Sequence, residues 1–188
     1  TWQPLGGVDA RPTLDGDEAK VVELPNGSVL LCSRSQKSKG RIFNIYTYTN
    51  AKKAEGRWAE PVYIDNKAYP SARCNGEVLV VKARRMADGK RTNVLLYSVP
   101  MSGKREKVGI YYKELASVAD YASPACFKSG WKVFRISNTD SAYSTMEQMR
   151  NGKIAFFYEE SELKGGYDMV FDSYTLSEIT NGEYQHSK

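Results

Sequence analysis

Asp140-Ser-Ala-Tyr-Ser-Thr-Met146 is followed closely by Arg150-Asn-Gly-Lys-Ile-Ala-Phe-Phe-Tyr-Glu159, and this part of the chain favours a β-hairpin. Asn-Gly between strand-like residues is the strongest short-range hairpin signal, because a tight two-residue turn needs positive φ at both central positions. The sequence therefore predicts a strand–turn–strand unit with Tyr143 just ahead of it. Tyr143 is one of 13 tyrosines, and packing within a sheet is the ordinary structural role of such a residue.

The same unit recurs along the chain. Asn-Gly also stands at 26–27 and 75–76 between strand-like residues, and again at 181–182. Helical periodicity is nearly absent, and short strand-like runs are expected over residues 19–24, 28–33, 42–49, 78–83, 92–99, 108–115, 131–136, 154–158 and 168–175. The first two Asn-Gly pairs are about 50 residues apart, which is typical of propeller blades built from four short strands. A β-sandwich is the competing fold.

Two segments carry a glycine near a tryptophan after a predicted strand. Asn50-Ala-Lys-Lys-Ala-Glu-Gly-Arg-Trp58 and residues 128–131 resemble degenerate forms of the Asp-box (BNR) turn of some propellers. Counting strands gives three blades and a remainder, and three blades cannot close a ring without leaving sheet edges and faces bare. We therefore expect residues 1–188 to be an incomplete propeller, completed by another piece of the same protein or by a partner chain.

Composition narrows the class of protein. The chain has 188 residues, 41% of them hydrophobic, which suits one globular domain. The net charge of +5 is spread over scattered lysines and arginines, and no nucleic-acid-binding module is visible. No run approaches the roughly 20 apolar residues that span a bilayer, so we expect no membrane span.

Cysteine and histidine offer little chemistry. Cys32, Cys74 and Cys126 are too few and too far apart for a disulfide scaffold or a zinc site, and we expect buried free thiols. The single histidine, His186, lies in a polar tail near the carboxyl terminus. A Ser-His or Cys-His mechanism is therefore poorly supported.

Three segments follow one another along the chain. The first is Asp17-Glu-Ala-Lys-Val-Val-Glu-Leu-Pro-Asn-Gly-Ser-Val-Leu-Leu-Cys-Ser-Arg34, the second is Leu96-Tyr-Ser-Val-Pro100 followed by Arg105, and the third is the stretch around Tyr143. As an ordered set they resemble the carboxyl-terminal half of the sialidases (exo-α-neuraminidases, glycoside hydrolase family 33), and residues 1–188 would be that part of a single propeller domain. The first resembles the family segment that begins with a catalytic glutamate and ends with an arginine, the second the segment with the next arginine, and the third the nucleophile segment. The match covers nearly the whole chain.

The resemblance implies a fold, a reaction and four roles. The fold would be an all-β six-bladed propeller, with this chain supplying about three to four blades. The reaction would be retaining hydrolysis of terminal α-linked sialic acid from sialylated glycans, with no metal or organic cofactor. Tyr143 would be the nucleophile, Glu18 its base, and Arg34 and Arg105 two members of a clamp for the substrate carboxylate. A secreted, periplasmic or cell-surface location would follow.

The residue types fit this chemistry on physical grounds. Sialic acid carries a carboxylate on its anomeric carbon, and guanidinium groups bind carboxylates bidentately while staying charged. Most retaining glycosidases attack with a carboxylate, and sialidases are the known exception with a tyrosine. A neutral phenol avoids repulsion by the substrate anion, but its pKa of about 10 calls for a neighbouring base. We also expect the surrounding arginines to favour the phenolate.

Each residue alone also fits a structural role. Glu18 could be an exposed carboxylate at a strand end, Arg34 a solvated hairpin flank, and Arg105 one charge in a loop. Other arginines compete for the clamp roles: Arg91 begins a predicted strand, Arg41 and Arg73 are nearby, and Arg11 is unassigned. The ordered set, rather than any one motif, favours the sialidase interpretation.

The chain departs from the family in its missing amino-terminal elements. The family's first arginine motif and its acid/base aspartate should precede this region by well over a hundred residues. Asp9, Asp15 and Asp17 are candidates for the acid by chemistry only. We therefore expect this polypeptide alone to be inactive. A non-catalytic glycan-binding propeller and a trans-sialidase are the alternative functions.

Overall fold

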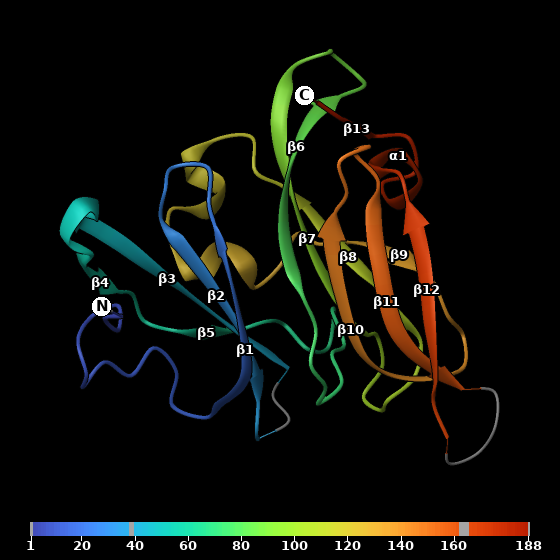
Figure 1. Cartoon of the computed structure of the whole chain (residues 1–188), viewed down its shortest axis with the longest axis horizontal. Coiled ribbons are helices and arrows are strands. Elements are labelled where there is room, and N and C mark those ends of the chain that lie inside the picture. The colour runs from blue at the N-terminus through green and yellow to red at the C-terminus, as the bar shows by residue number, and fades with distance from the viewer. Residues whose placement is uncertain (1, 38–39, 162–165, 188) are drawn as a thin grey trace.

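The protein is all-β, with three antiparallel sheets stacked side by side (Figure 1). The computed structural model describes residues 2–37, 40–161 and 166–187. The first sheet contains β1 (Gly16–Glu23), β2 (Val29–Ser35), β3 (Arg41–Asn50) and β4 (Glu55–Trp58), with β5 (Val62–Tyr63) paired to β3. The central sheet contains β6 (Val78–Arg85), β7 (Arg91–Pro100), β8 (Val108–Glu114) and β9 (Lys132–Arg135), with β13 (Tyr184–His186) beside β6. The third sheet contains β10 (Asp140–Gln148), β11 (Ile154–Ser161) and β12 (Asp168–Tyr174).

Helices are few and short. Three 3₁₀ turns lie between strands, η1 (Ala51–Lys53), η2 (Val118–Tyr121) and η3 (Pro124–Phe127), and α1 (Leu176–Ile179) precedes β13. No helix in the described part of the chain is long and apolar enough to cross a membrane.

Two apolar layers hold the stack together, one on each face of the central sheet. The first layer joins Leu30 and Phe43 of the first sheet to Leu95 and Tyr97 of β7. The second layer joins Leu96 of β7 to residues such as Phe156 of the third sheet. β7 is buried on both faces and reads as a nearly continuous apolar run, as expected for a strand in the middle of three layers.

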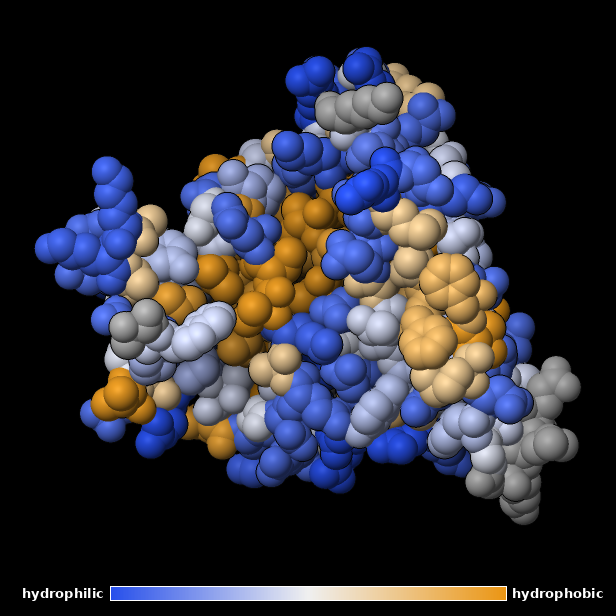
Figure 2. Space-filling view, viewed as in Figure 1, coloured by the Kyte–Doolittle hydropathy of each residue, from blue (hydrophilic) through white to orange (hydrophobic). Residues whose placement is uncertain are grey.

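The two outer faces of the stack differ. Over the first sheet, Pro12 accepts a hydrogen bond from the Asn44 side chain at 2.7 Å, and Leu5 accepts one from the Trp58 indole at 2.9 Å, so the amino-terminal segment covers this sheet. No segment in the described part of the chain covers the third sheet in this way: Phe157, Met169 and Phe171 are 39%, 56% and 62% exposed. Apolar side chains accordingly gather on the surface over β11 and β12 (Figure 2).

The Asn-Gly turns differ in detail from expectation. Gly27 and Gly152 have φ of +83°, but Asn26 and Asn151 do not have positive φ. In each turn the glycine N–H donates to the carbonyl three residues earlier, at 2.8 Å to Leu24 and 2.9 Å to Met149. These are three-residue hairpin loops ending in a left-handed glycine, not two-residue turns with positive φ at both positions.

Asn75-Gly76 is not a hairpin turn, and the prediction was wrong there. The pair lies in the irregular segment before β6, and Gly76 does not have positive φ. A Cβ on Gly76 would overlap the Ser98 carbonyl oxygen and approach the Arg41 guanidinium. Glycine is therefore needed at this position for a close backbone approach, which sequence alone does not distinguish from a turn.

Three further expectations need correction. Tyr143 lies inside β10, not ahead of the hairpin. The carboxyl-terminal tail around His186 forms β13 on the edge of the central sheet. Cys32 and Cys74 are buried free thiols as expected, but Cys126 is only half-buried and lies in η3.

Candidate active site

Glu18 and Arg34 are brought together by the first hairpin. The β1–β2 register shifts between Asp17 and Lys20, so Glu18 lies in a β-bulge, and its φ is +46°. The Asp17 carboxylate accepts a hydrogen bond from the Glu18 N–H at 2.9 Å, which holds the bulge closed. A bulge redirects a side chain that regular alternation would place elsewhere, and positive φ in a non-glycine residue costs about 1 kcal/mol or more.

Tyr143 is positioned by a second β-bulge, which lies in the third sheet. The β10–β11 register shifts between Ser141 and Ser144, so Tyr143 also lies in a bulge near the start of its strand. The Glu159 carboxylate accepts a hydrogen bond from the Tyr143 N–H at 3.0 Å. Ser144 on the buried side contacts the Ser98 hydroxyl at 2.9 Å. The chain around Tyr143 is therefore fixed to its own sheet by Glu159 and to the central sheet by Ser98.

The two bulges bring Tyr143 and Glu18 into direct contact. The Tyr143 hydroxyl donates a hydrogen bond to Oε1 of Glu18, although the residues are 125 positions apart. The second oxygen, Oε2, accepts from Nη1 of Arg34 at 2.8 Å. The side chains of Arg34 and Glu18 are 17% and 24% exposed, so solvent reaches this group.

Arg105 lies against Tyr143 from the β7–β8 loop. Its guanidinium carbon is 5.4 Å from the centre of the Tyr143 ring, a cation–π contact. Its backbone carbonyl accepts the Ser141 N–H at 2.9 Å, and Glu106 forms a β-bridge with Asp140. The loop is thus bonded to the start of β10, which fixes Arg105 relative to Tyr143. All four residues predicted for the site are brought together.

The competing arginines lie elsewhere or serve other contacts. Arg91 starts β7 opposite Arg84, at the other end of the sheet. Arg41 is buried and donates to the Tyr97 hydroxyl at 3.0 Å and to the Cys74 carbonyl at 2.7 Å. Arg11 donates to the carbonyl of its neighbour Ala10, and Arg73 is exposed beside Arg105.

Arg34 keeps one unused donor. Its Nε is buried and has no hydrogen-bond partner among the residues that the structure describes. An unsatisfied buried N–H is costly unless a ligand or water completes it. The nitrogen is enclosed by protein atoms, so it does not itself face solvent.

The charges of the central pair follow from these contacts. Partial burial opposes ionisation of Glu18, but hydrogen bonds from Tyr143 and Arg34 outweigh it and lower the pKa of the carboxylate. The hydrogen bond to Glu18 raises the pKa of Tyr143, and the positive charges of Arg34 and Arg105 offset this only in part. The two arginines thus favour the phenolate, as expected, but the hydrogen bond to Glu18 has the larger effect on the pKa of Tyr143. The resting state is a neutral phenol beside an ionised acceptor.

The acidic candidates near the amino terminus have structural contacts. Asp15 is buried and accepts hydrogen bonds from the Tyr63 hydroxyl at 2.6 Å and Ser35 at 2.9 Å. Burial raises the pKa of Asp15, and these hydrogen bonds reverse that effect and lower it. Asp17 is used in the Glu18 bulge, and Asp9 is exposed in the amino-terminal segment. None of the three faces Tyr143 as a proton donor through a described contact.

Sequence reasoning missed two neighbours of Tyr143. Glu159, which fixes the bulge, ends the predicted hairpin but had no predicted role, because strand alternation does not reveal a bulge. Cys74 packs with Ala72, Ala142 and Tyr143 beneath the site. Burial raises the pKa of Cys74 to about 11, so this thiol is inert at neutral pH.

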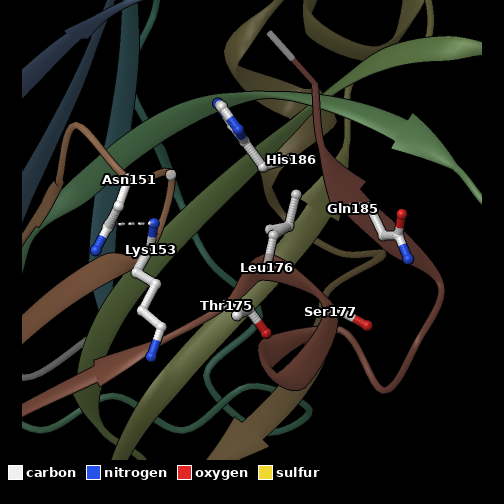
Figure 3. Close-up of a pocket in the computed structure, with 8 residues that line it drawn as sticks. Asn151, Lys153, Thr175, Leu176, Ser177, Gln185 and His186 are labelled. Atoms are coloured by element: carbon white, nitrogen blue, oxygen red, sulfur yellow. Dashed lines mark hydrogen bonds between the residues drawn. The ribbon is translucent and has the colours of Figure 1, made fainter.

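One cavity lies away from these residues, toward the other end of the strands. A cavity of about 260 Å³ is lined by the β10–β11 turn, α1 and His186 (Figure 3). Figure 3 shows Asn151 and Lys153 on one side and Thr175, Leu176 and His186 on the other. It lies at the turn end of the third sheet, whereas Tyr143 lies near the start of β10. Within the described ranges, no group of three or more His, Cys, Asp and Glu side chains is placed to hold a metal ion.

Comparison of the chain with known proteins identifies its fold. No protein-family model matches the chain, and no curated protein sequence matches it. Among solved structures, the intramolecular trans-sialidase from Ruminococcus gnavus, in complex with oseltamivir carboxylate, is similar with a TM-score of 0.59 and 18% identity over 86% of this chain. An all-β fold of the sialidase-like, propeller-type class of glycosidases is therefore supported.

Two other glycosidases have similar structures. The α-L-arabinofuranosidase Arb93A from Fusarium graminearum has a TM-score of 0.53 at 11% identity over 92% of this chain. The α-L-arabinanase from Penicillium chrysogenum has a TM-score of 0.50 at 16% identity over 83% of it. The chain spans 33% of the trans-sialidase structure, 47% of the arabinofuranosidase and 45% of the arabinanase, which is half of their length or less.

Proposed function

We propose that this chain carries the nucleophile half of the active site of a retaining exo-sialidase. The observation that supports this most is the hydrogen bond from the Tyr143 hydroxyl to Glu18, with Arg34 bound to Glu18 and Arg105 against the Tyr143 ring. The proposed substrate is a glycan ending in α-linked sialic acid. The pairing also favours an enzyme over a non-catalytic glycan-binding propeller, because lectin-type binding needs no base for a phenol.

The chemistry proceeds in two steps. Tyr143 attacks the anomeric carbon while its proton passes to Glu18, and a new C–O bond forms as the bond to the leaving oxygen breaks. The leaving oxygen takes a proton from a general acid that this chain does not supply. In the second step water attacks the anomeric carbon and gives a proton to the conjugate base of that acid, and the displaced phenolic oxygen takes its proton back from Glu18. A neutral phenol approaches a carbon that carries a carboxylate without like-charge repulsion, which an aspartate or glutamate would suffer.

Arg34 and Arg105 bind the substrate carboxylate in this proposal. The Arg34 side chain is partly exposed beside Glu18, and the Arg105 guanidinium lies against the Tyr143 ring. Guanidinium groups remain charged throughout the working pH range. No metal ion or organic cofactor enters this scheme.

We further propose that the domain is a six-bladed propeller completed by sheets beyond these residues. The bare face of the third sheet, with Phe157, Met169 and Phe171, supports this, because large apolar patches usually mark a contact surface. The missing sheets would also carry the general acid and a further clamp arginine. On this scheme, residues 1–188 alone turn over ordinary sialosides poorly, and the complete protein is secreted or displayed at a cell surface.

The nucleophile can be tested without the missing acid. A sialosyl fluoride with a second fluorine at ring carbon 3 has a leaving group that needs little protonation, and its glycosyl-enzyme hydrolyses slowly. We expect intact-protein mass spectrometry to show one added sialosyl group, located on Tyr143 by peptide mapping. The Tyr143→Phe variant is the control. Labelling at another residue, or no labelling at all, would contradict the proposed function.

The alternative function, a trans-sialidase, would form the same tyrosyl intermediate. Hydrolysis and transfer differ only in whether water or an acceptor sugar then attacks that intermediate. Adding an acceptor such as lactose to the labelled chain separates the two. Release as free 3-fluorosialic acid indicates a hydrolase, and recovery as a sialylated acceptor indicates a transferase.

A further inference from the structure

A second, smaller cavity adjoins the candidate site. It measures about 200 Å³ and lies between the segment before β6 and the β7–β8 loop. Its lining includes Asn66, Ser71, Arg73, Lys104 and Arg105. Three of these five side chains are cations, and none is an acid.

The neutral polar groups of the cavity already have partners. The Asn66 side-chain oxygen accepts the Ser71 N–H at 2.8 Å, and the Ser71 hydroxyl accepts a hydrogen bond from Tyr97 at 3.0 Å. These bonds fix the side-chain oxygens of Asn66 and Ser71 in the wall of the cavity.

The cations, by contrast, have no acidic partners. Neither Arg73, Lys104 nor Arg105 belongs to any ion pair of the described residues. The nearest acidic residue in sequence, Glu106, uses its backbone in the bridge to Asp140. Three uncompensated positive charges around one hollow create a potential that attracts an anion.

Arg105 connects this cavity to the nucleophile. The same guanidinium lines the cavity and lies 5.4 Å from the Tyr143 ring centre. A group held in the cavity is therefore adjacent to whatever is bound at Tyr143. This position suits the sugar next to a bound terminal residue.

We propose that this cavity is a subsite for an anionic group, a carboxylate or a sulfate, on the glycan unit next to the terminal sialic acid. The inference rests on the proposed function, since Tyr143 and the clamp would hold the terminal sugar. It makes glycans with two neighbouring acidic groups preferred ligands over glycans with one.

Binding measurements test the subsite without turnover. Calorimetric titration of the full chain at low salt compares a sialyl-lactoside with the corresponding disialyl-lactoside and with a sulfated sialyl-lactoside. We expect the doubly anionic ligands to bind about five- to tenfold more tightly, because two exposed ion pairs contribute modestly at low ionic strength. Preference for the disialyl or the sulfated ligand identifies the anion. The preference should shrink in 0.5 M salt, because the Debye length there is roughly a third of its value in dilute buffer and exposed charges are screened more strongly.

A matched pair of variants places the effect in the cavity. Arg73→Met with Lys104→Met removes two charges from the cavity, and Arg150→Met with Lys153→Met removes two from the opposite end of the third sheet. We expect the first variant to lose the preference and the second to keep it. Equal affinity for singly and doubly anionic ligands, or a preference that survives in the cavity variant, would overturn the subsite alone. Failure of every sialoside to bind would overturn the proposed function as well.

Discussion

The two ends of the strands in this molecule are built in different ways. At one end, the β1–β2 and β10–β11 turns close with Gly27 and Gly152 at positive φ, and the chain follows local turn chemistry. At the other end, Glu18 and Tyr143 each lie in a β-bulge. Their side chains are in direct contact although the two residues are 125 positions apart in the sequence. Figure 1 shows the β1–β2, β6–β7 and β10–β11 turns together at the top of the view. Local regularity is thus kept at one end and given up at the end that holds the candidate site.

This contrast predicts different consequences of substitution. At the turn end, a change should alter stability by the cost of one backbone conformation. At the site end, a change of the bulge side chains Glu18 and Tyr143 should alter chemistry far more than stability, because the bulges already depart from the regular pairing. Four variants test this division.

The largest effect is expected for Tyr143→Phe. Loss of the hydroxyl removes the proposed nucleophile, so the rate of labelling by the difluorosialoside should fall at least about 1,000-fold. The unfolding free energy should change by only about 1–3 kcal/mol, the value of a hydrogen bond to a charged group. Mass spectrometry and urea titration measure the two quantities. Near-normal labelling would remove Tyr143 from the mechanism.

Glu18→Gln should act next most strongly. Without a base the labelling rate should fall about 100- to 10,000-fold at neutral pH. In the wild type, the lowered pKa of Glu18 keeps the base active until the pH drops below the ordinary glutamate value, about 4.3, and the rate then declines.

The same ionisation contributes to stability. Because the folded-state pKa of Glu18 is lowered, its contribution is complete above the unfolded pKa and is lost as the pH falls through the folded pKa. The Glu18→Gln variant should lack this acid-side loss. Urea titrations between about pH 3 and 7 compare the two chains, and parallel curves would show that Glu18 is not ionised in the contact with Arg34.

Gly76→Ala tests the close approach beneath the site. An added Cβ overlaps the Ser98 carbonyl, so the segment before β6 must shift, at a cost of about 3 kcal/mol or more. Gly103→Ala is the matched control, because a Cβ added there would meet nothing within 4 Å and the φ of Gly103 is not positive. Similar denaturation midpoints for the two variants would show that the approach at Gly76 is not constrained.

Gly27→Ala should have the smallest effect. The space around it is open, so the cost is only that of a left-handed backbone, about 1 kcal/mol. Labelling at Tyr143 should be unchanged, because the turn lies at the far end of β1. A loss of labelling in this variant would break the division between the two ends.

Sequence reasoning named the four residues that meet in the candidate site but not the geometry that joins them. The order of Glu18, Arg34, Arg105 and Tyr143 could be read from short segments, and the structure brings these four together. The bulges could not be read, because strand alternation assumes a regular register and nothing in the residues near Glu18 or Tyr143 marks the shift. The same assumption hid the contact of Glu159 with the Tyr143 backbone.

Two other differences show where local signals fail. Asn75-Gly76 has the composition of a hairpin turn, but its glycine is explained by the nearness of Ser98, which only the tertiary fold reveals. The polar tail at His186 has no apolar run, yet it pairs with β6 because the edge of the central sheet is open to it. Most of the strands, by contrast, could be predicted from their apolar runs.

The central sheet has a consequence for the spacing of the candidate site. Glu18 comes from the first sheet and Tyr143 from the third, and each of these sheets packs on a different face of the central one. The separation between base and phenol is therefore set by the thickness of a third layer that contributes neither of them. The core side chains of β6 and β7 therefore help to set the distance between Tyr143 and Glu18. A methylene lost or added in this core should change the length of the Tyr143–Glu18 hydrogen bond without any direct contact with the two residues.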